Sequence, residues 1–209
     1  MRDATRVIHQ VSSWCLSYPD DEFCDRLPML RAAVGELRPG KARDCLERFL
    51  EHIAGQEVES LRTTYVDVFD MSRKHALHLS YWTDGDTRRR GEALGEFKKH
   101  FRGSGFLVDT GGELPDFLPM VLEYAAVADP VDGAELLQSY RASIELLRIA
   151  LTEIESPYAQ VLVAICSTLP GASPGDRNAV MRMVGAEPPT ETVGLEPYDP
   201  RLLPLDTVR

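Results

Sequence analysis

Apolar residues recur at intervals of three and four positions along most of this chain, and this pattern constrains its fold more than any other feature. Four stretches show it, with apolar positions spread over 7–18, 23–37, 45–53 and 61–69. Such spacing gathers apolar side chains on one face of an α-helix. No sustained alternation of period two occurs along the chain. The sequence therefore predicts an all-α fold.

The second half of the chain divides into a helical part and a proline-rich part. Its longest apolar pattern predicts a core-facing seam from Leu137 through Tyr140 to Ile154. Ser156 and Pro157 are then expected to be the N-cap and the first position of another helix. Prolines are frequent after residue 170, where we expect one short helix near 178–184. We predict a single helical domain at 1–170 and a loosely attached, partly disordered tail at 171–209.

The charge of the chain argues against two classes of partner. The formal net charge is −10, which disfavours binding to nucleic acids or to anionic membrane surfaces. No apolar run approaches the length of a membrane span, and the first residues are too charged for a signal peptide. The four cysteines are widely spaced and are expected to be buried free thiols. A cytoplasmic protein is expected, with a basic or amphipathic partner.

The stretch "YWTDGDTRRRG" at 81–91 differs from its surroundings. Asp86 is expected to be an N-cap and Thr87 the first residue of a helix that directs its apolar side chains inward and ends near Gly103. Gly91 and Gly95 lie four apart, so another backbone could approach that face closely.

Three arginines, Arg88 to Arg90, fall in the first turn of this predicted helix, where the helix dipole disfavours positive charge. We therefore expect acids to hold them, either Asp84 and Asp86 or acids of a neighbouring helix. Direct contact with a ligand is the alternative interpretation.

Motifs for catalysis or metal binding are not recognisable. The glycines at 103–112 follow a predicted helix and do not match the spacing of a phosphate-binding loop. His75 and His78 are three apart, but a third ligand with suitable spacing is not evident. We expect no enzyme activity, no metal and no cofactor. A DNA-binding regulator that uses the arginine-rich helix, and an enzyme with an undetected metal site, are the rival classes.

Aromatic and acidic residues surround the arginine-rich stretch. Tyr81 and Trp82 are either core anchors or part of a groove for an amphipathic helix. Further along, "ELPDFLPMVLEYAA" at 113–126 is interpreted as a helix capped by Asp116, with Leu118, Val121, Leu122 and Ala125 on its buried face. Glu123 lies beside this face and is expected to point to solvent or to the loop before the helix.

Two blocks of the chain resemble a known family. The block at 65–106 contains "YVDVFD" and "GDTRRRG", and the block at 113–126 begins "ELPDFLP". Together they closely resemble the nitrate reductase molybdenum-cofactor assembly chaperones, the NarJ or delta-subunit family. Trp82 and Tyr124 stand where the family often has Tyr and Phe, so both changes keep an aromatic ring. The resemblance covers about residues 5–170 and does not extend to the tail.

The resemblance implies a single all-helical bundle of the TorD-like redox-enzyme chaperone class. Such proteins are not enzymes. Members of the nitrate reductase branch bind the N-terminal segment of the catalytic alpha subunit and hold the apoenzyme competent for insertion of molybdenum cofactor. A chaperone for a different molybdoenzyme of the same class is the alternative.

The expected site residues fall into two groups. An amphipathic alpha-subunit peptide is expected to contact four apolar and three acidic residues: Leu77, Tyr81, Trp82, Met120, Asp84, Asp86 and Glu123. The motif residues matched by the resemblance are expected to shape the loop and helix beside that groove: Tyr65, Phe69, Asp70, Gly85, Thr87, Arg88, Arg90 and Asp116.

Overall fold

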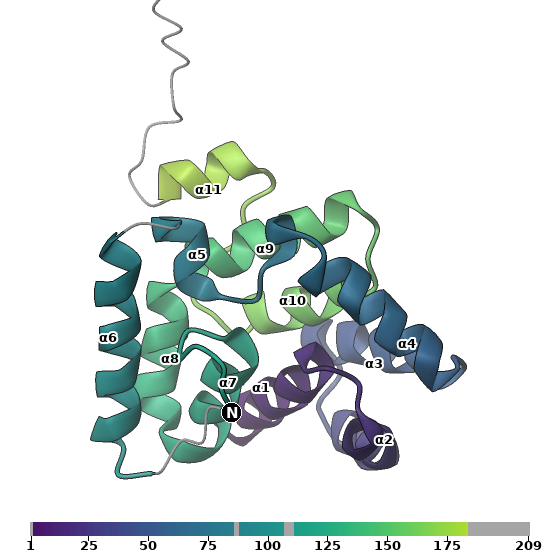
Figure 1. The fold of residues 1–209 in the computed structure, drawn as a ribbon. Coiled ribbons are helices and arrows are strands. Elements are labelled where there is room, and N and C mark those ends of the chain that lie inside the picture. Colours follow the sequence, from purple (N-terminus) through teal and green to yellow (C-terminus); the bar gives the residue numbers. More distant parts are fainter. Residues whose placement is uncertain (1, 86–87, 107–110, 184–209) are drawn as a thin grey trace, which may run out of the picture.

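The structure is a computed structural model that describes residues 2–85, 88–106 and 111–183 (Figure 1). The α-helices are α1 (Arg2–Leu16), α2 (Asp21–Gly35), α3 (Lys41–Ala54), α4 (Val58–Tyr65), α5 (Leu79–Asp84), α6 (Arg88–Gly103), α7 (Leu118–Glu123), α8 (Pro130–Ser139), α9 (Arg141–Glu153), α10 (Tyr158–Cys166) and α11 (Arg177–Met183). In these ranges β-structure is limited to one isolated bridge between His78 and Phe117. The prediction of an all-α fold is confirmed.

Helix α10 lies at the centre of the bundle because it is the most apolar helix. Seven of its nine residues are buried, and it packs against α1, α3 and α9. Helix α1 in turn packs against α7 and the turn after it. One continuous core therefore joins α1 and α3 to α9 and α10, and other helices cover this core with apolar side chains, whereas α11 packs on a separate small cluster.

Two helices continue into wider π-helical turns. The turn η1 (Val66–Asp70) extends α4 and closes with a hydrogen bond from Met71 N to Val66 O at 2.9 Å. The turn η3 (Tyr124–Ala128) extends α7 and closes from Asp129 N to Tyr124 O at 3.1 Å. Such turns are rare and often lie at functional sites. Each of these two borders a surface pocket.

The predicted seam from Leu137 to Ile154 runs over two helices. Helices α8 and α9 meet at Tyr140, and Ile154 at the far end is 48% exposed. The apolar spacing continues across the break, so periodicity alone cannot reveal it.

The prediction that Ser156 caps the next helix is wrong. Ser156 closes the preceding helix through a bond from its N–H to Leu151 O, and its hydroxyl has no partner among the described residues. Pro157 takes the N-cap position of α10.

Part of the segment expected to be a loose tail is packed on α9. Arg141 donates to Gly171 O at 2.9 Å and Arg148 donates to Pro174 O at 2.6 Å. Helix α11 then buries Val180 completely, and Figure 1 shows this helix lying over α9. The short helix expected near 178–184 is thus observed. Residues 184–209 lie outside the described residues, and the domain boundary at 171 remains a prediction.

The four cysteines are free, and Cys15, Cys45 and Cys166 are buried while Cys24 is half-buried. None of the helices in the described ranges has the length and apolar character that crossing a bilayer requires.

Candidate functional site

An open cleft of about 390 Å³ lies where four separate segments meet. The segments are the turn between α1 and α2, the π-turn η1, the strand-like stretch before α5, and the loop before α7. Most of the residues that line it carry an aromatic ring, and two are acidic. The lining residues are Tyr18, Tyr65, Phe69, Asp70, Ala76, Leu77, His78, Glu113 and Phe117.

Stacked aromatic rings form one wall of the cleft. Tyr65 is buried, and its ring centroid lies 5.5 Å from that of Tyr18 and 4.9 Å from that of Phe69. Tyr65 and Phe69 are four residues apart and so lie on one helical face. The Tyr65 hydroxyl donates to Leu16 O at 3.1 Å, which fixes this ring against the end of α1. Tyr18 is 45% exposed, so its ring is available to a ligand.

Arg62 of α4 holds the turn that carries Tyr18. Its Nε donates to Pro19 O at 3.1 Å, and its Nη2 lies 2.6 Å from Asp21 Oδ1. Asp20 caps α2 by accepting a bond from Phe23 N at 2.8 Å. These contacts set the position of Tyr18 relative to the ring wall.

The opposite wall is a short antiparallel contact between the stretch before α5 and the loop before α7. Leu118 N donates to Leu77 O at 2.8 Å, and Leu79 N donates to Asp116 O at 3.0 Å. His78 and Phe117 pair at this bridge, with ring centroids 5.5 Å apart. Backbone pairing therefore brings residues far apart in the sequence to one side of the cleft.

Asp116 caps a helix, but not the helix that the sequence predicted. Its buried carboxylate accepts bonds from the N–H and the hydroxyl of Ser80, in the first turn of α5. Helix α7 itself begins after Phe117 and has no side-chain cap. The backbone pairing explains this difference because it places Asp116 beside the start of α5 instead of the start of α7.

Acidic and apolar side chains surround the mouth of the cleft. Asp70 and Glu113 are exposed, and Glu113 lies 3.6 Å from His78 Nε2. Burial raises the pKa of Tyr65, and the nearby charges of Asp70 and Glu113 add to this rise. Met71 and Leu114, next to these acids in the chain, are 77% and 41% exposed. The mouth thus offers negative charge beside apolar surface.

The structure does not bring the expected peptide contacts together on one face. Leu77 lines the cleft, whereas Met120 is buried in the core. Trp82 is half-buried and donates from Nε1 to Ala76 O at 2.9 Å. Tyr81 lies under the guanidinium of Arg90, which is 5.8 Å from its ring centroid.

The expected acidic contacts are also dispersed. Asp84 is half-buried at the end of α5, and Glu123 is exposed at the end of α7. Gly85 ends α5 with a φ of +56°, and its N–H bonds to Tyr81 O. Asp86 and Thr87 lie outside the described residues.

The motif residues Tyr65, Phe69 and Asp70, expected to shape the site, line the cleft themselves. Sequence reasoning missed five lining residues: Tyr18, Ala76, His78, Glu113 and Phe117. Their signal was present in the stretches "LSYPDDEF", "HALHLSYW" and "ELPDFLP", where aromatic rings and acids lie close together.

The three arginines of the run differ in their contacts. Arg88 and Arg89 are exposed and form no ion pair with any described residue. Arg90 turns inward to the ring of Tyr81. The sequence offered Asp84, Asp86 or an acid of a neighbouring helix as partners for these arginines, and because Asp86 lies outside the described residues, that expectation remains a prediction.

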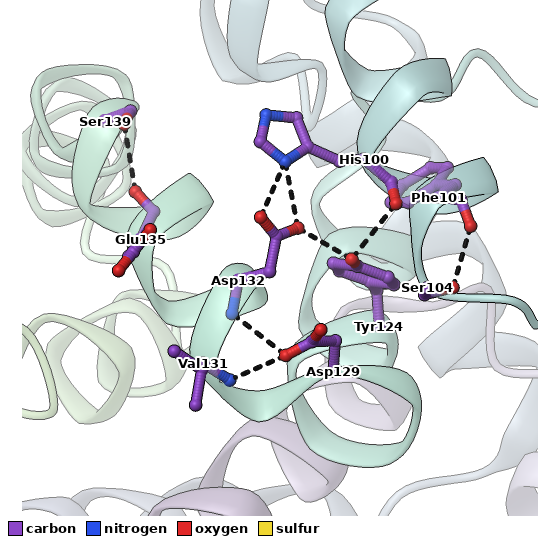
Figure 2. A network of polar contacts seen from close by, with 9 residues as sticks. All are labelled: His100, Phe101, Ser104, Tyr124, Asp129, Val131, Asp132, Glu135 and Ser139. Carbon is purple, nitrogen blue, oxygen red and sulfur yellow. Dashed lines mark hydrogen bonds and ion pairs between the residues drawn. The ribbon is translucent and has the colours of Figure 1, made fainter.

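A second pocket of about 380 Å³ lies between α6, η3 and α8, and its polar groups bond to one another (Figure 2). His100 Nδ1 lies 2.9 Å from both carboxylate oxygens of Asp132. The Tyr124 hydroxyl lies 2.6 Å from Asp132 Oδ2 and 3.2 Å from His100 O. Its single proton is directed to the carboxylate, because a charged acceptor forms the stronger bond. This network fastens α6 to α8.

Two further contacts stiffen this corner. Asp129 caps α8 by accepting from Val131 N and Asp132 N, both at 3.0 Å, as Figure 2 shows. Gly133 packs so closely on η3 that a Cβ at its position would lie 2.4 Å from Ala125 Cα. Burial and the bond to Asp132 both raise the pKa of Tyr124, burial having the larger effect.

The two histidines considered as metal ligands face different partners. His75 Nδ1 lies 3.0 Å from Val68 O, and His78 faces Glu113. Within the described residues, no group of three or more His, Cys, Asp or Glu side chains is arranged to hold a metal ion.

A comparison with protein families identifies the family of this chain. Residues 36–164 match the model of the nitrate reductase delta subunit family. The chain belongs to this family. The matched part includes most of the lining of the cleft and the whole of the polar pocket.

Family relatives are similar over most of this chain. A nitrate reductase molybdenum cofactor assembly chaperone, NarJ of Bacillus subtilis, is 34% identical over 78% of this chain and 89% of its own length. The nitrate reductase-like protein NarX of Mycobacterium tuberculosis is 39% identical over 78% of this chain, but the chain spans 24% of the length of NarX. The NarJ chaperone of Escherichia coli is 27% identical over 71% of this chain and 64% of its own.

A solved structure shares the fold. The crystal structure of a redox enzyme maturation protein from Archaeoglobus fulgidus covers 78% of this chain and 92% of its own, with a TM-score of 0.59 and 21% identity. The resemblance to the delta subunit family noted from the sequence is thus confirmed, and so is the helical bundle.

Proposed function

We propose that this protein is a non-catalytic assembly chaperone for respiratory nitrate reductase. It binds the N-terminal segment of the catalytic alpha subunit in the aromatic cleft and holds the apoenzyme ready for insertion of molybdenum cofactor. The observation that carries the proposal is an open, ring-lined cleft with acids at its mouth, in a member of the delta subunit family.

The chemistry of the cleft fits an amphipathic basic segment. Rings of Tyr18, Phe69 and Phe117 offer apolar surface to the apolar side of a peptide. Asp70 and Glu113 lie where basic residues of the same peptide could pair with them. Cationic side chains can also lie over the exposed face of Tyr18.

The size of the cleft suits a ligand that must later dissociate. A cleft of about 390 Å³ accommodates a few side chains, which limits the apolar area that a peptide can bury. Costs of association and of ordering the peptide reduce the net affinity further. We therefore expect binding in the micromolar to nanomolar range, roughly −8 to −12 kcal/mol.

Calorimetry with a synthetic peptide of the alpha-subunit N-terminus tests the proposal. Tyr18→Ala should weaken peptide binding by about 1 kcal/mol or more because it removes an exposed ring. Tyr81→Ala, the matched control on α5, should leave affinity unchanged. The opposite result would place the peptide at the residues that the sequence first indicated, and no binding by the unaltered protein would refute the proposed ligand.

A chaperone for a different molybdoenzyme is the second candidate, since a redox enzyme maturation protein of Archaeoglobus fulgidus shares this fold. The two candidates differ in the catalytic subunit that co-purifies. Recovery of another molybdoenzyme, with no nitrate reductase alpha subunit, would favour the second.

A further inference from the structure

The outward face of α6 carries a concentration of positive charge that the cleft does not use. The helix contains six Lys or Arg and two Glu, a balance of +4, while the whole chain has −10, which leaves −14 for all other residues. Phe97 and Phe101 face inward and are buried. Five cations are exposed: Arg88, Arg89, Lys98, Lys99 and Arg102. Figure 1 shows α6 along one edge of the molecule, with α8 on its inner side.

These cations have little compensation within the chain. Arg88, Arg89, Lys98 and Arg102 form no ion pair with the residues that the structure describes, and Lys99 pairs with Glu96 on the same helix. Arg88 and Arg89 also lie in the first helical turn, where the helix dipole disfavours them. Within the described residues these cations gain no visible stabilisation from their positions, so they are available to a partner outside the chain.

Two glycines leave a gap in the middle of the same face. Gly91 and Gly95 lie inside α6, where glycine lowers helix stability relative to alanine. A Cβ at either position would meet nothing within 4 Å, so packing in this chain does not require either glycine. They are four residues apart. Helical spacing places them on the same face as Arg88 before them and Lys98 and Arg102 after them. A backbone could approach α6 closely between these cations.

We propose that this face of α6, defined by Arg88, Gly91, Gly95, Lys98 and Arg102, binds an acidic polypeptide segment of the nitrate reductase alpha subunit outside its N-terminal segment. The inference rests on the proposed function. Charge selects an acidic partner, and the gap at the two glycines favours a polypeptide over a lipid surface or a nucleic acid, whose charged groups need no such gap. The α6 face and the cleft would then bind the alpha subunit at two places. Binding at either place raises the effective concentration of the alpha subunit at the other.

Charge reversal tests this inference on the full chain and the full-length, cofactor-free alpha subunit. Arg88→Glu/Lys98→Glu/Arg102→Glu should weaken binding of the alpha subunit by about tenfold or more and flatten its salt dependence. The control Arg31→Glu/Arg38→Glu/Lys41→Glu changes net charge equally, on exposed residues of the distant α2–α3 region, and should bind as the unaltered protein does. Equal weakening by both variants would overturn the proposal.

A second variant tests the gap without changing charge. Gly91→Leu/Gly95→Leu should leave the melting temperature unchanged or higher, yet bind the alpha subunit at least about tenfold more weakly, because the side chains block close approach. Unchanged binding would overturn the proposal. So would capture of anionic phosphatidylglycerol vesicles or duplex DNA by α6 with no effect of either variant on the alpha subunit.

The isolated N-terminal peptide separates this inference from the proposed function. Both α6 variants should bind the peptide as tightly as the unaltered protein does. If the unaltered protein fails to bind the peptide, the proposed function fails. If peptide binding is normal and the alpha subunit binds equally to all variants, only the role of α6 fails.

Discussion

The two pockets of this molecule have nearly the same volume, about 390 and 380 Å³, and each borders a π-helical turn. Their linings differ. In the polar pocket, Asp132 is bound by His100 and Tyr124, and Asp129 is bound by backbone N–H groups. In the aromatic cleft, the ring of Tyr18 and the side chains of Asp70 and Glu113 are exposed. The two pockets therefore share their size and a neighbouring π-turn but differ in their polar groups, which bond to one another or to backbone N–H groups in one pocket and are exposed in the other.

The polar pocket should be the more sensitive to added volume. Gly133→Ala should destabilise the protein by about 3 kcal/mol, because the new Cβ would overlap the backbone of Ala125. Denaturant unfolding measures the loss. Gly91→Ala, at a helical glycine with open surroundings, should instead stabilise by about 0.5–1 kcal/mol. If both variants are equally stable, the close packing of α8 on η3 is not significant.

Acid should lower the stability of the fold through His9 of α1, a helix that supports both pockets. Burial lowers the pKa of His9 from 6.5 to about 4. The unfolded chain therefore binds a proton between these values and the folded chain does not, so stability falls as pH decreases from about 6.5 to 4. The total is about 3 kcal/mol. His9→Gln, which can still bond to Thr168, should flatten this part of the pH profile of unfolding.

The control for this pH profile is His52→Gln, which alters an exposed histidine of α3. It should keep the fall in stability seen in the unaltered protein. A steep acid profile that persists in His9→Gln would assign the effect to another group.

Replacing carboxylates should affect peptide binding at the cleft and stability at the polar pocket. Asp70→Asn/Glu113→Gln at the cleft should weaken binding of the basic alpha-subunit peptide by about 1 kcal/mol, with less salt dependence. Asp129→Asn/Asp132→Asn at the polar pocket should lower the melting temperature and leave peptide affinity unchanged, because these groups serve as a cap and a fastening between helices. Calorimetry and thermal unfolding on both variants measure the difference. Weaker peptide binding by the second variant would contradict this division.

The smallest contrast concerns one tyrosine in each region. Burial is the main cause that raises the pKa of both Tyr65 and Tyr124. The unfolded chain therefore releases these protons first, and stability is lost as pH rises above about 10. Tyr65→Phe and Tyr124→Phe should each reduce this alkaline loss, at a cost of about 1 kcal/mol near neutral pH for the missing hydrogen bond. Alkaline unfolding curves test both, and a curve unchanged in either variant would show that its tyrosine does not contribute.

Sequence reasoning succeeded where the signal was local. The spacing of apolar residues predicted the helices and the buried face of α7, because both follow from the period of one helix. It failed at the break at Tyr140, since the apolar spacing is the same on both sides. Motif similarity pointed to Tyr65, Phe69 and Asp70, and these line the cleft.

The candidate site was predicted only in part because its walls come from separate parts of the chain. Tyr81 and Trp82 are prominent in the sequence, yet Tyr81 faces Arg90 and Trp82 bonds to Ala76. Tyr18 was not selected, because the aromatic and acidic residues around it do not reveal which distant residue its ring contacts, and that residue is Tyr65. The role of Asp116 depends in the same way on Ser80, which is 36 residues away.

The amino-acid sequence by itself determined that this protein is helical, that it carries net negative charge, and that it resembles the delta subunit family. Those properties depend on residues close together or on simple sums. Only the tertiary structure decided which rings and carboxylates share a cleft and which polar groups satisfy one another. The physical reason is that many of these contacts join residues far apart in the sequence, 32 positions in His100–Asp132 and 36 in Ser80–Asp116, and packing of the whole core sets such distances.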